Sequence, residues 1–245
     1  MHLIIFDLDG TLVHSDRRDS NYFAQAYETI YQQPFPTIDW TKYPHVTDTS
    51  IFNTVVAQHF DRIPTPDEIA IFQQHYINLL EEGRQQMPEQ FQSIPGAPAL
   101  MAHLHAAPDQ YRTCLATGGW QAPARVKLRH VGLLSDRLGI HGADGKMTRE
   151  AILSEAIEAA GGAHQYAKIV YVGDAEWDVT TTRKMQLDFV GIRWRGDREV
   201  LHEAGASQVI ENFLDLDAFF RALHLATPPA DFQSSAKKLS FEDCA

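Results

Sequence analysis

Cysteine is scarce in this chain, whose 245 residues include only Cys114 and Cys244. Two cysteines so far apart form no disulfide framework, and this usage is typical of a reducing compartment. Long apolar runs are also missing. The first one, residues 3–6, is too short for the core of a signal peptide, and no run reaches the length of a membrane span. We therefore expect a cytoplasmic protein with no membrane partner.

Basic residues are fewer than acidic ones, with 21 Lys and Arg against 32 Asp and Glu and a formal net charge of -11. Nucleic-acid binding depends on clustered basic side chains, so no nucleic-acid partner is expected. The 12 histidines show no spacing typical of a zinc site. Length and composition are those of one large domain, or of a core with a smaller insertion, and we expect a monomer or a weak homodimer.

The most informative stretch is LIIFDLDGTLV, residues 3–13. Its apolar run predicts a buried parallel strand, which ends at two carboxylates, Asp7 and Asp9, followed by Gly10 and Thr11. Ligands bind in open α/β sheets at this end of a strand. Two like charges this close favour a divalent cation between them, and oxygen ligands favour Mg²⁺. The alternative is that one Asp caps the following turn while the other is solvated.

Apolar spacing then predicts three consecutive helices, and Pro95–Pro98 interrupts the chain. The three helices cover residues 20–32, 48–60 and 67–82. After the prolines, helices alternate with strands. Strands are predicted at residues 111–116, 138–141, 169–172, 188–193 and 208–210. Helices are predicted at residues 97–106, 121–131, 149–160, 177–186, 198–204 and 215–223.

This alternation predicts an α/β fold, with a parallel sheet covered by helices on both faces. The three early helices then form an insertion after the first strand. We expect a catalytic core of residues 1–14 and 95–226, a helical domain of residues 15–94, and a poorly ordered tail of residues 227–245.

Polar residues follow three of the predicted strands: DLDGT at 7–11, TGG at 117–119, and GDAEWD at 173–178. All carboxyl ends of a parallel sheet lie on one edge, so these groups should converge in one crevice. A cation, Lys146 or Arg149, lies between the second and third groups in sequence.

These motifs resemble those of the haloacid dehalogenase-like superfamily of phosphohydrolases, over residues 1 to about 225. The resemblance implies a three-layer Rossmann-like core with Mg²⁺ as cofactor. It also implies that Asp7 is the nucleophile, that Asp9 is the acid and base, and that Thr117 binds the phosphoryl group. The metal ligands implied are Asp7, the main-chain carbonyl of Asp9, and Asp174, with Asp178 in or near the metal site.

The cation of the third motif has two candidates. Counting back from the apolar register of the predicted helix at 149–160 reaches Lys146 or Arg149, as in different members of the superfamily. We favour Lys146, with Arg149 next to it. Lys127 is expected to be a surface residue of its helix.

Phosphate contacts are expected from Thr11 and from the backbone of Gly118. In the insertion, His45 and Thr47 lie in a connecting stretch where such proteins present residues to substrate. The alternative there is a plain turn with a helix N-cap at Thr47 or Asp48.

Together these features predict a Mg²⁺-dependent phosphatase, similar to phosphoglycolate phosphatases, that hydrolyses a small phosphorylated metabolite through an aspartyl-phosphate. The insertion is expected to act as a mobile cap that excludes water. One alternative is a phosphomutase of the β-phosphoglucomutase type. Another is a non-catalytic regulatory protein that binds a phosphorylated metabolite.

Overall fold

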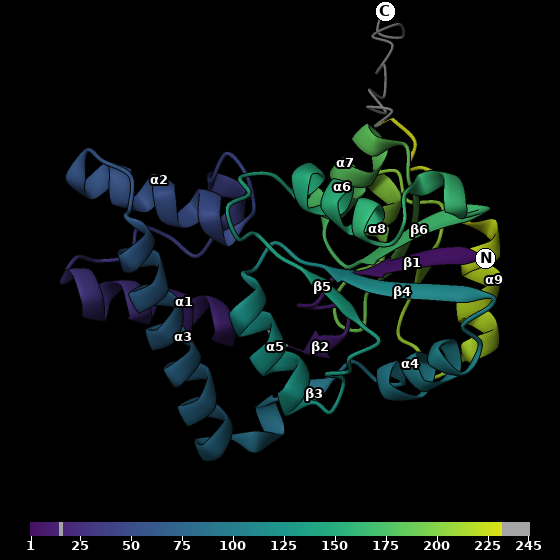
Figure 1. Cartoon of the computed structure of the whole chain (residues 1–245), viewed down its shortest axis with the longest axis horizontal. Helices are drawn as coiled ribbons and strands as arrows, with labels where there is room; N and C mark the ends of the chain where they lie inside the picture. The colour runs from purple at the N-terminus through teal and green to yellow at the C-terminus, as the bar shows by residue number, and fades with distance from the viewer. Residues whose placement is uncertain (15–16, 232–245) are drawn as a thin grey trace, which may run out of the picture.

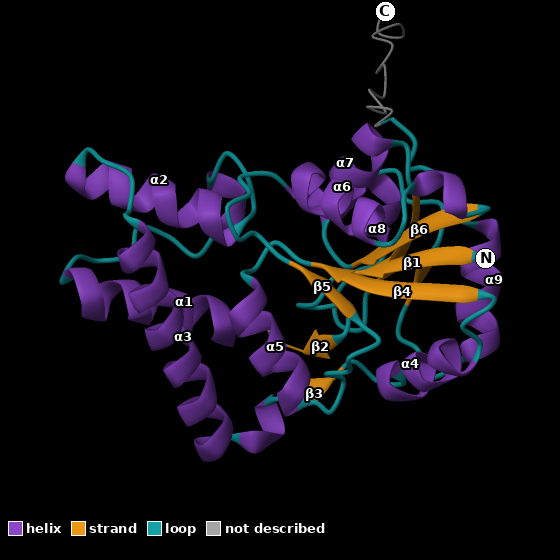
Figure 2. Ribbon diagram, viewed as in Figure 1, coloured by secondary structure: helices purple, strands orange, loops and turns teal. Residues whose placement is uncertain are grey.

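The computed structural model describes residues 1–14 and 17–231 and has a parallel sheet at its centre. Six strands lie in the order β5-β4-β1-β6-β7-β8 (Figures 1 and 2). Their bounds are β1 His2–Phe6, β4 Tyr111–Ala116, β5 Gly139–His141, β6 Lys168–Gly173, β7 Asp188–Ile192 and β8 Val209–Ile210. Every pairing in this sheet is parallel, which confirms the predicted α/β class.

β1 is a central strand because its residues are apolar on both faces. Leu3 and Ile5 belong to one hydrophobic core, and Ile4 and Phe6 to another. Side chains alternate along a strand, so these two cores lie on opposite faces of the sheet. The strand therefore needs helices on both sides, as the sequence predicted.

Two groups of helices supply these layers. On the face of Ile4 and Phe6 the core includes side chains of α4 (Ala97–Ala106) and α9 (Leu216–Leu225). On the face of Leu3 and Ile5 it includes α6 (Arg149–Ala159), α7 (Glu176–Met185) and α8 (Glu199–Glu203). A further helix, α5, covers Gln121–His130 and contributes to both cores. The result is a three-layer arrangement.

The early helices lie beside this sheet in Figure 1. Their bounds are α1 Arg18–Tyr31, α2 Asp48–Phe60 and α3 Pro66–Gln86. Short 3-10 turns occur at Trp40–Lys42, Pro88–Gln90 and Ala163–Gln165. Aromatic side chains of these helices, Phe23, Phe52 and Phe72, pack around Trp120 of the α/β part. Trp120 is 1% exposed, so it packs the insertion against the α/β part.

A small antiparallel ladder joins the two ends of the insertion and was not predicted. β2 (Val13–His14) pairs with β3 (Gln92–Ser93), and Val13 lies opposite Ser93. Two residues per strand are too few for a period of two to be recognised in a sequence. The division at residues 14/15 and 94/95 remains a prediction, and residues 15 and 16 fall outside the described ones.

The chain after α9 begins with ordered contacts. The carbonyl of Thr227 accepts a hydrogen bond from the N–H of Phe189, and the N–H of Ala230 donates to Gly205. The remainder of the predicted tail, residues 232–245, lies outside the described residues. Within the described ranges, no helix combines the length and the apolar character that crossing a bilayer requires.

Candidate active site

The carboxyl ends of β1, β4 and β6 meet at one cavity of about 380 Å³. Asp7 follows β1, Thr117 follows β4 and Asp174 follows β6, and all three line this cavity. Asp9, Gly118 and Arg149 also line it. The parallel sheet thus brings together groups that are far apart in the sequence.

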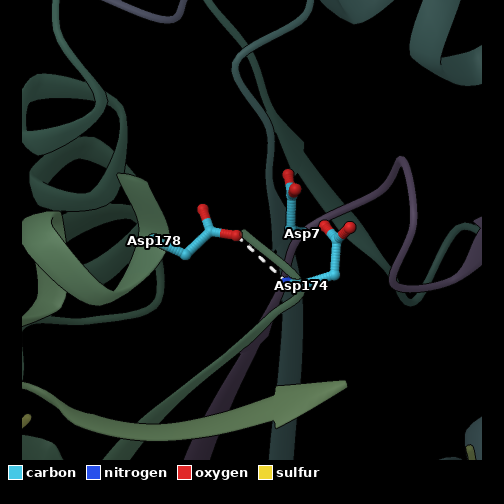
Figure 3. A group of neighbouring side chains, drawn as sticks. All are labelled: Asp7, Asp174 and Asp178. Atoms are coloured by element: carbon cyan, nitrogen blue, oxygen red, sulfur yellow. Dashed lines mark hydrogen bonds between the residues drawn. The ribbon is translucent and has the colours of Figure 1, made fainter. Parts of the chain in front are cut away.

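Three carboxylates lie close together at this edge of the sheet, and two of them, Asp7 and Asp174, line the cavity. One ligand oxygen from each of Asp7, Asp174 and Asp178 lies within 4.8 Å of the others (Figure 3). Burial raises the pKa of Asp7 to about 7, despite the opposing charge of Arg149. Burial, then the charges of Asp178 and Asp7, raise the pKa of Asp174 well above its usual range. A divalent cation would neutralise this crowding, so the donor set fits one.

Gly10 allows this close approach. Its φ is +79°, and a Cβ there would lie 2.1 Å from Oδ2 of Asp174. The side chain of Asp7 also retains acceptor capacity, because its buried Oδ1 accepts no hydrogen bond from a described residue. Both observations favour an oxygen-lined cation site between Asp7 and Asp174.

Asp178 is engaged differently from the other two carboxylates. Its Oδ1 accepts from Arg149 Nη2 at 2.6 Å and from the Tyr171 hydroxyl at 3.3 Å. Its Oδ2 accepts from the backbone N–H groups of Asp174 and Ala175, each at 3.1 Å (Figure 3). A carboxylate has about four acceptor sites, and Arg149 and the two backbone N–H groups occupy three of them. The single hydrogen of the Tyr171 hydroxyl also has the carbonyl of Ala116 as an acceptor, at 3.1 Å. Asp178 thus anchors Asp174 and Arg149, and its place in the expected metal site stays a prediction.

The structure places the two candidate cations differently. Arg149 is the first residue of α6, and its Nη2 lies 3.3 Å from Oδ1 of Asp7. Lys146 precedes the helix, and its Nζ lies 2.6 Å from Glu155 and outside the cavity lining. The structure thus places Arg149, and not the favoured Lys146, next to Asp7, and the role of either residue in the third motif stays a prediction.

Lys127 is the main residue that sequence reasoning missed. It was expected on the surface, yet its side chain is 7% exposed, and its Nζ lies 2.9 and 2.8 Å from the two oxygens of Asp9. The same Nζ lies 2.9 Å from Oδ2 of Asp19 in α1. Burial alone would lower the pKa of Lys127, but Asp19 and Asp9 raise it well above its usual value. Its only sequence signal is its place on the inner face of α5, between the buried residues Val126 and Leu128.

The predicted phosphate contacts divide into two groups. Thr117 and Gly118 line the cavity, and the Thr117 hydroxyl oxygen accepts from the N–H of Gly119 at 3.1 Å. That bond leaves the hydroxyl hydrogen available to a phosphate oxygen. Thr11 is fully buried and lies outside the lining, so its side chain does not reach the cavity.

The structure places the two predicted contacts from the insertion differently, and their contact with substrate stays a prediction. His45 is exposed and outside the lining. The hydroxyl of Thr47 caps α2 by accepting from the N–H of Ser50 at 3.2 Å, and it donates to the carbonyl of Met147 at 3.0 Å. Thr47 and the neighbouring Asp48 both line the cavity.

A family model described as haloacid dehalogenase-like hydrolase matches residues 1–185. The chain therefore belongs to the haloacid dehalogenase-like hydrolase family, and the expected class, a phosphohydrolase enzyme of this family, is confirmed.

Among its relatives, a phosphoglycolate phosphatase of Cereibacter sphaeroides is 30% identical over 189 residues, which are 76% of this chain and 82% of that one. A solved hydrolase structure from Pseudomonas syringae has a TM-score of 0.66 at 21% identity, over 90% of this chain and 98% of that one. CbbY from Rhodobacter sphaeroides, in complex with phosphate, has a TM-score of 0.66 at 17% identity, over 91% and 99%. These structures share the fold and confirm the predicted fold family.

Proposed function

We propose that the protein is a Mg²⁺-dependent phosphatase of small phosphomonoesters, similar in mechanism to phosphoglycolate phosphatases. The observation that carries this proposal is the meeting of Asp7, Asp174 and Arg149 in one cavity, with Arg149 3.3 Å from Asp7. A carboxylate can attack a phosphoryl group only if its negative charge is compensated, and Arg149 lies where this is needed.

In this mechanism a carboxylate oxygen of Asp7 attacks phosphorus and forms an aspartyl-phosphate, while the bond from phosphorus to the ester oxygen breaks. Asp9 gives a proton to the leaving oxygen and later takes one from the water that hydrolyses the aspartyl-phosphate. Thr117 donates its hydroxyl hydrogen to the phosphoryl group, and the backbone of Gly118 lies beside it. Arg149 holds the phosphoryl group and Asp7 together.

Asp7, Asp174 and the main-chain carbonyl of Asp9 are the groups that would hold Mg²⁺. When bound, the ion supplies positive charge to the phosphoryl oxygens and to the attacking carboxylate. Asp178 fixes Arg149 and Asp174 by accepting hydrogen bonds from Nη2 of Arg149 and from the backbone N–H of Asp174. We also propose that residues 15–94 act as a cap over the cavity, since side chains of α1, α2 and α3 line it together with those of the sheet edge.

The test is phosphate release from a panel of small phosphomonoesters, with and without Mg²⁺. We expect Mg²⁺-dependent release by the wild type, none by Asp7→Asn, and a phosphorylated wild-type enzyme detectable by mass after a rapid acid quench. Full activity of Asp7→Asn would disprove the mechanism. Isomerisation of a sugar phosphate with little free phosphate would show a phosphomutase, and ligand-induced stabilisation without turnover would show a non-catalytic binding protein.

A further inference from the structure

Asp48 is fixed in the cavity by contacts between the insertion and the sheet edge. It is the first residue of α2, and its backbone N–H donates to the carbonyl of Gly118 at 2.8 Å. Its Oδ2 accepts from the backbone N–H of Trp120 at 2.9 Å. Both partners belong to the loop after β4 that also carries Thr117. The carboxyl group therefore has a defined position next to the expected phosphoryl site.

No cation pairs with this carboxylate among the described residues. The charged groups that influence it are Lys127, Asp9 and Asp144. Lys127 is held by Asp9 and Asp19, and Asp144 accepts from the N–H of Gln121. Oδ1 of Asp48 receives no hydrogen bond from a described residue. Burial raises the pKa of Asp48 to about 7, which agrees with a carboxyl group that lacks a charged partner.

The cavity that Asp48 lines also has an apolar and aromatic part. It includes Phe23, Trp40, Ile51, Tyr76 and Trp120. In such surroundings a single carboxylate discriminates strongly, because a bound group must either satisfy it or leave it desolvated. A second carboxylate placed against it would add like-charge repulsion.

Four arginines also line this cavity, and none of them forms an ion pair with Asp48 among the described residues. Arg149 is paired with Asp7 and Asp178. Arg17 and Arg195 line this cavity and also a second one, which Asp48 does not line. Arg193 donates to the carbonyl oxygens of Asp174 and Asp197.

We infer that Asp48 determines substrate specificity, by selecting phosphomonoesters whose leaving group carries a hydroxyl or ammonium donor and by rejecting those that carry a carboxylate. This inference rests on the proposed phosphatase function, and it deepens that function by naming the chemical class of the leaving group. The selecting group comes from the insertion, whereas the groups assigned to the chemistry come from the sheet edge and α6.

Three esters of nearly equal size test the inference: 2-hydroxyethyl phosphate, phosphoethanolamine and phosphoglycolate. We expect wild-type kcat/KM to be at least about tenfold higher for the first two than for the third. In Asp48→Asn, kcat/KM for phosphoethanolamine divided by kcat/KM for phosphoglycolate should fall by about tenfold or more. The kcat/KM for 2-hydroxyethyl phosphate should change by less than about threefold, because the amide oxygen still accepts a hydrogen bond. Asn also keeps an acceptor for Trp120, and a thermal melt checks the fold of the variant.

Asp61→Asn is the matched control. It makes the same change at the other end of α2, on an exposed residue outside the cavity whose φ of 54° suits Asn. It should leave all three kcat/KM values unchanged. Three outcomes would overturn the inference. The wild type could have its highest kcat/KM for phosphoglycolate, or Asp48→Asn could leave the ratio of kcat/KM for phosphoethanolamine to that for phosphoglycolate unchanged. The third outcome is hydrolysis of p-nitrophenyl phosphate but of none of the three esters. Failure of the wild type to release phosphate from any ester, p-nitrophenyl phosphate included, would instead refute the phosphatase function, and the inference with it.

Discussion

The ammonium group of Lys127 lies 2.9 and 2.8 Å from the two carboxylate oxygens of Asp9. It also lies 2.9 Å from Asp19, so a helix of the insertion and a helix of the core are joined at the side chain assigned to proton transfer. A buried lysine requires such partners, because an unpaired buried charge is costly. The orientation of Asp9 therefore depends on α1 and α5 as well as on β1.

Replacing Lys127 by Met should lower kcat by about tenfold to a hundredfold, because Asp9 loses the group that orients it. It should also lower the free energy of unfolding by about 3 kcal/mol, since Asp9 and Asp19 both lose this buried cation, although Asp19 keeps its ion pair with Arg18. Steady-state kinetics and urea denaturation measure the two effects. Lys184→Met, on a side chain that is 62% exposed, is the control and should change neither. A normal kcat in Lys127→Met would show that Asp9 is oriented without the lysine.

Arg149→Met should reduce kcat/KM by at least about a hundredfold, because it removes positive charge next to Asp7 where charge develops. Lys146→Met should stay within about twofold of the wild type, because that lysine pairs with Glu155. Both variants change one cation to the same neutral side chain, three positions apart. The opposite order of activities would restore Lys146 to the role first expected from the sequence.

Mg²⁺ should stabilise the protein against heat, because it neutralises carboxylates whose pKa values are raised by burial. At a concentration 100 times its dissociation constant, an ion that binds only the folded state adds about 2.7 kcal/mol. Asp174→Asn should abolish most of this gain and raise the Mg²⁺ concentration needed for activity. Differential scanning calorimetry with and without EDTA measures the gain. Equal stabilisation of the variant would place the ion elsewhere.

The free energy of unfolding should respond to pH through Asp48. Its pKa is raised from 3.8 to about 7, so between these values the folded state binds more protons than the unfolded state. The contribution of Asp48 to the free energy of unfolding is therefore fully present below about pH 4 and is lost as pH rises toward 7. Above pH 7 it no longer changes. Asp48→Asn has no carboxyl group to ionise, so its free energy of unfolding should not fall in this way. At pH 8 it should exceed that of the wild type by on the order of 2 kcal/mol, which is less than the full pKa shift corresponds to because water in the cavity screens the charge. Urea denaturation at pH 4 and pH 8 measures this difference, and an equal difference at both pH values would contradict it.

Much of the fold could be predicted because its signals are local. The strand at 111–116 and the helices at 48–60 and 97–106 were found with their observed bounds. The meeting of Asp7, Thr117 and Asp174 also followed from the sequence, because parallel strands place their carboxyl ends on one edge.

The partners of individual side chains could not be predicted in the same way. Lys127 is buried where helices of the insertion meet α5: its Nζ pairs with Asp19 of α1 and lies 5.9 Å from the ring centroid of Tyr76 in α3. No spacing in the sequence indicates these contacts. Lys146 and Arg149 are separated by the start of α6, where Thr148 is the N-cap. A shift of a few residues in a helix start reverses which cation faces the cavity, and helix starts carry that uncertainty.

The ladder between β2 and β3 means that the chain leaves the α/β part and returns to it at adjacent points, since Val13 and Ser93 are direct partners. The entropic cost of closing a loop grows only with the logarithm of its length. Inserted segments of different length or origin could therefore be exchanged between these two anchor residues while β1 and β4 keep their pairing. Selectivity for other esters could therefore be acquired by replacing the inserted segment alone, while the strands that carry the cavity residues keep their pairing.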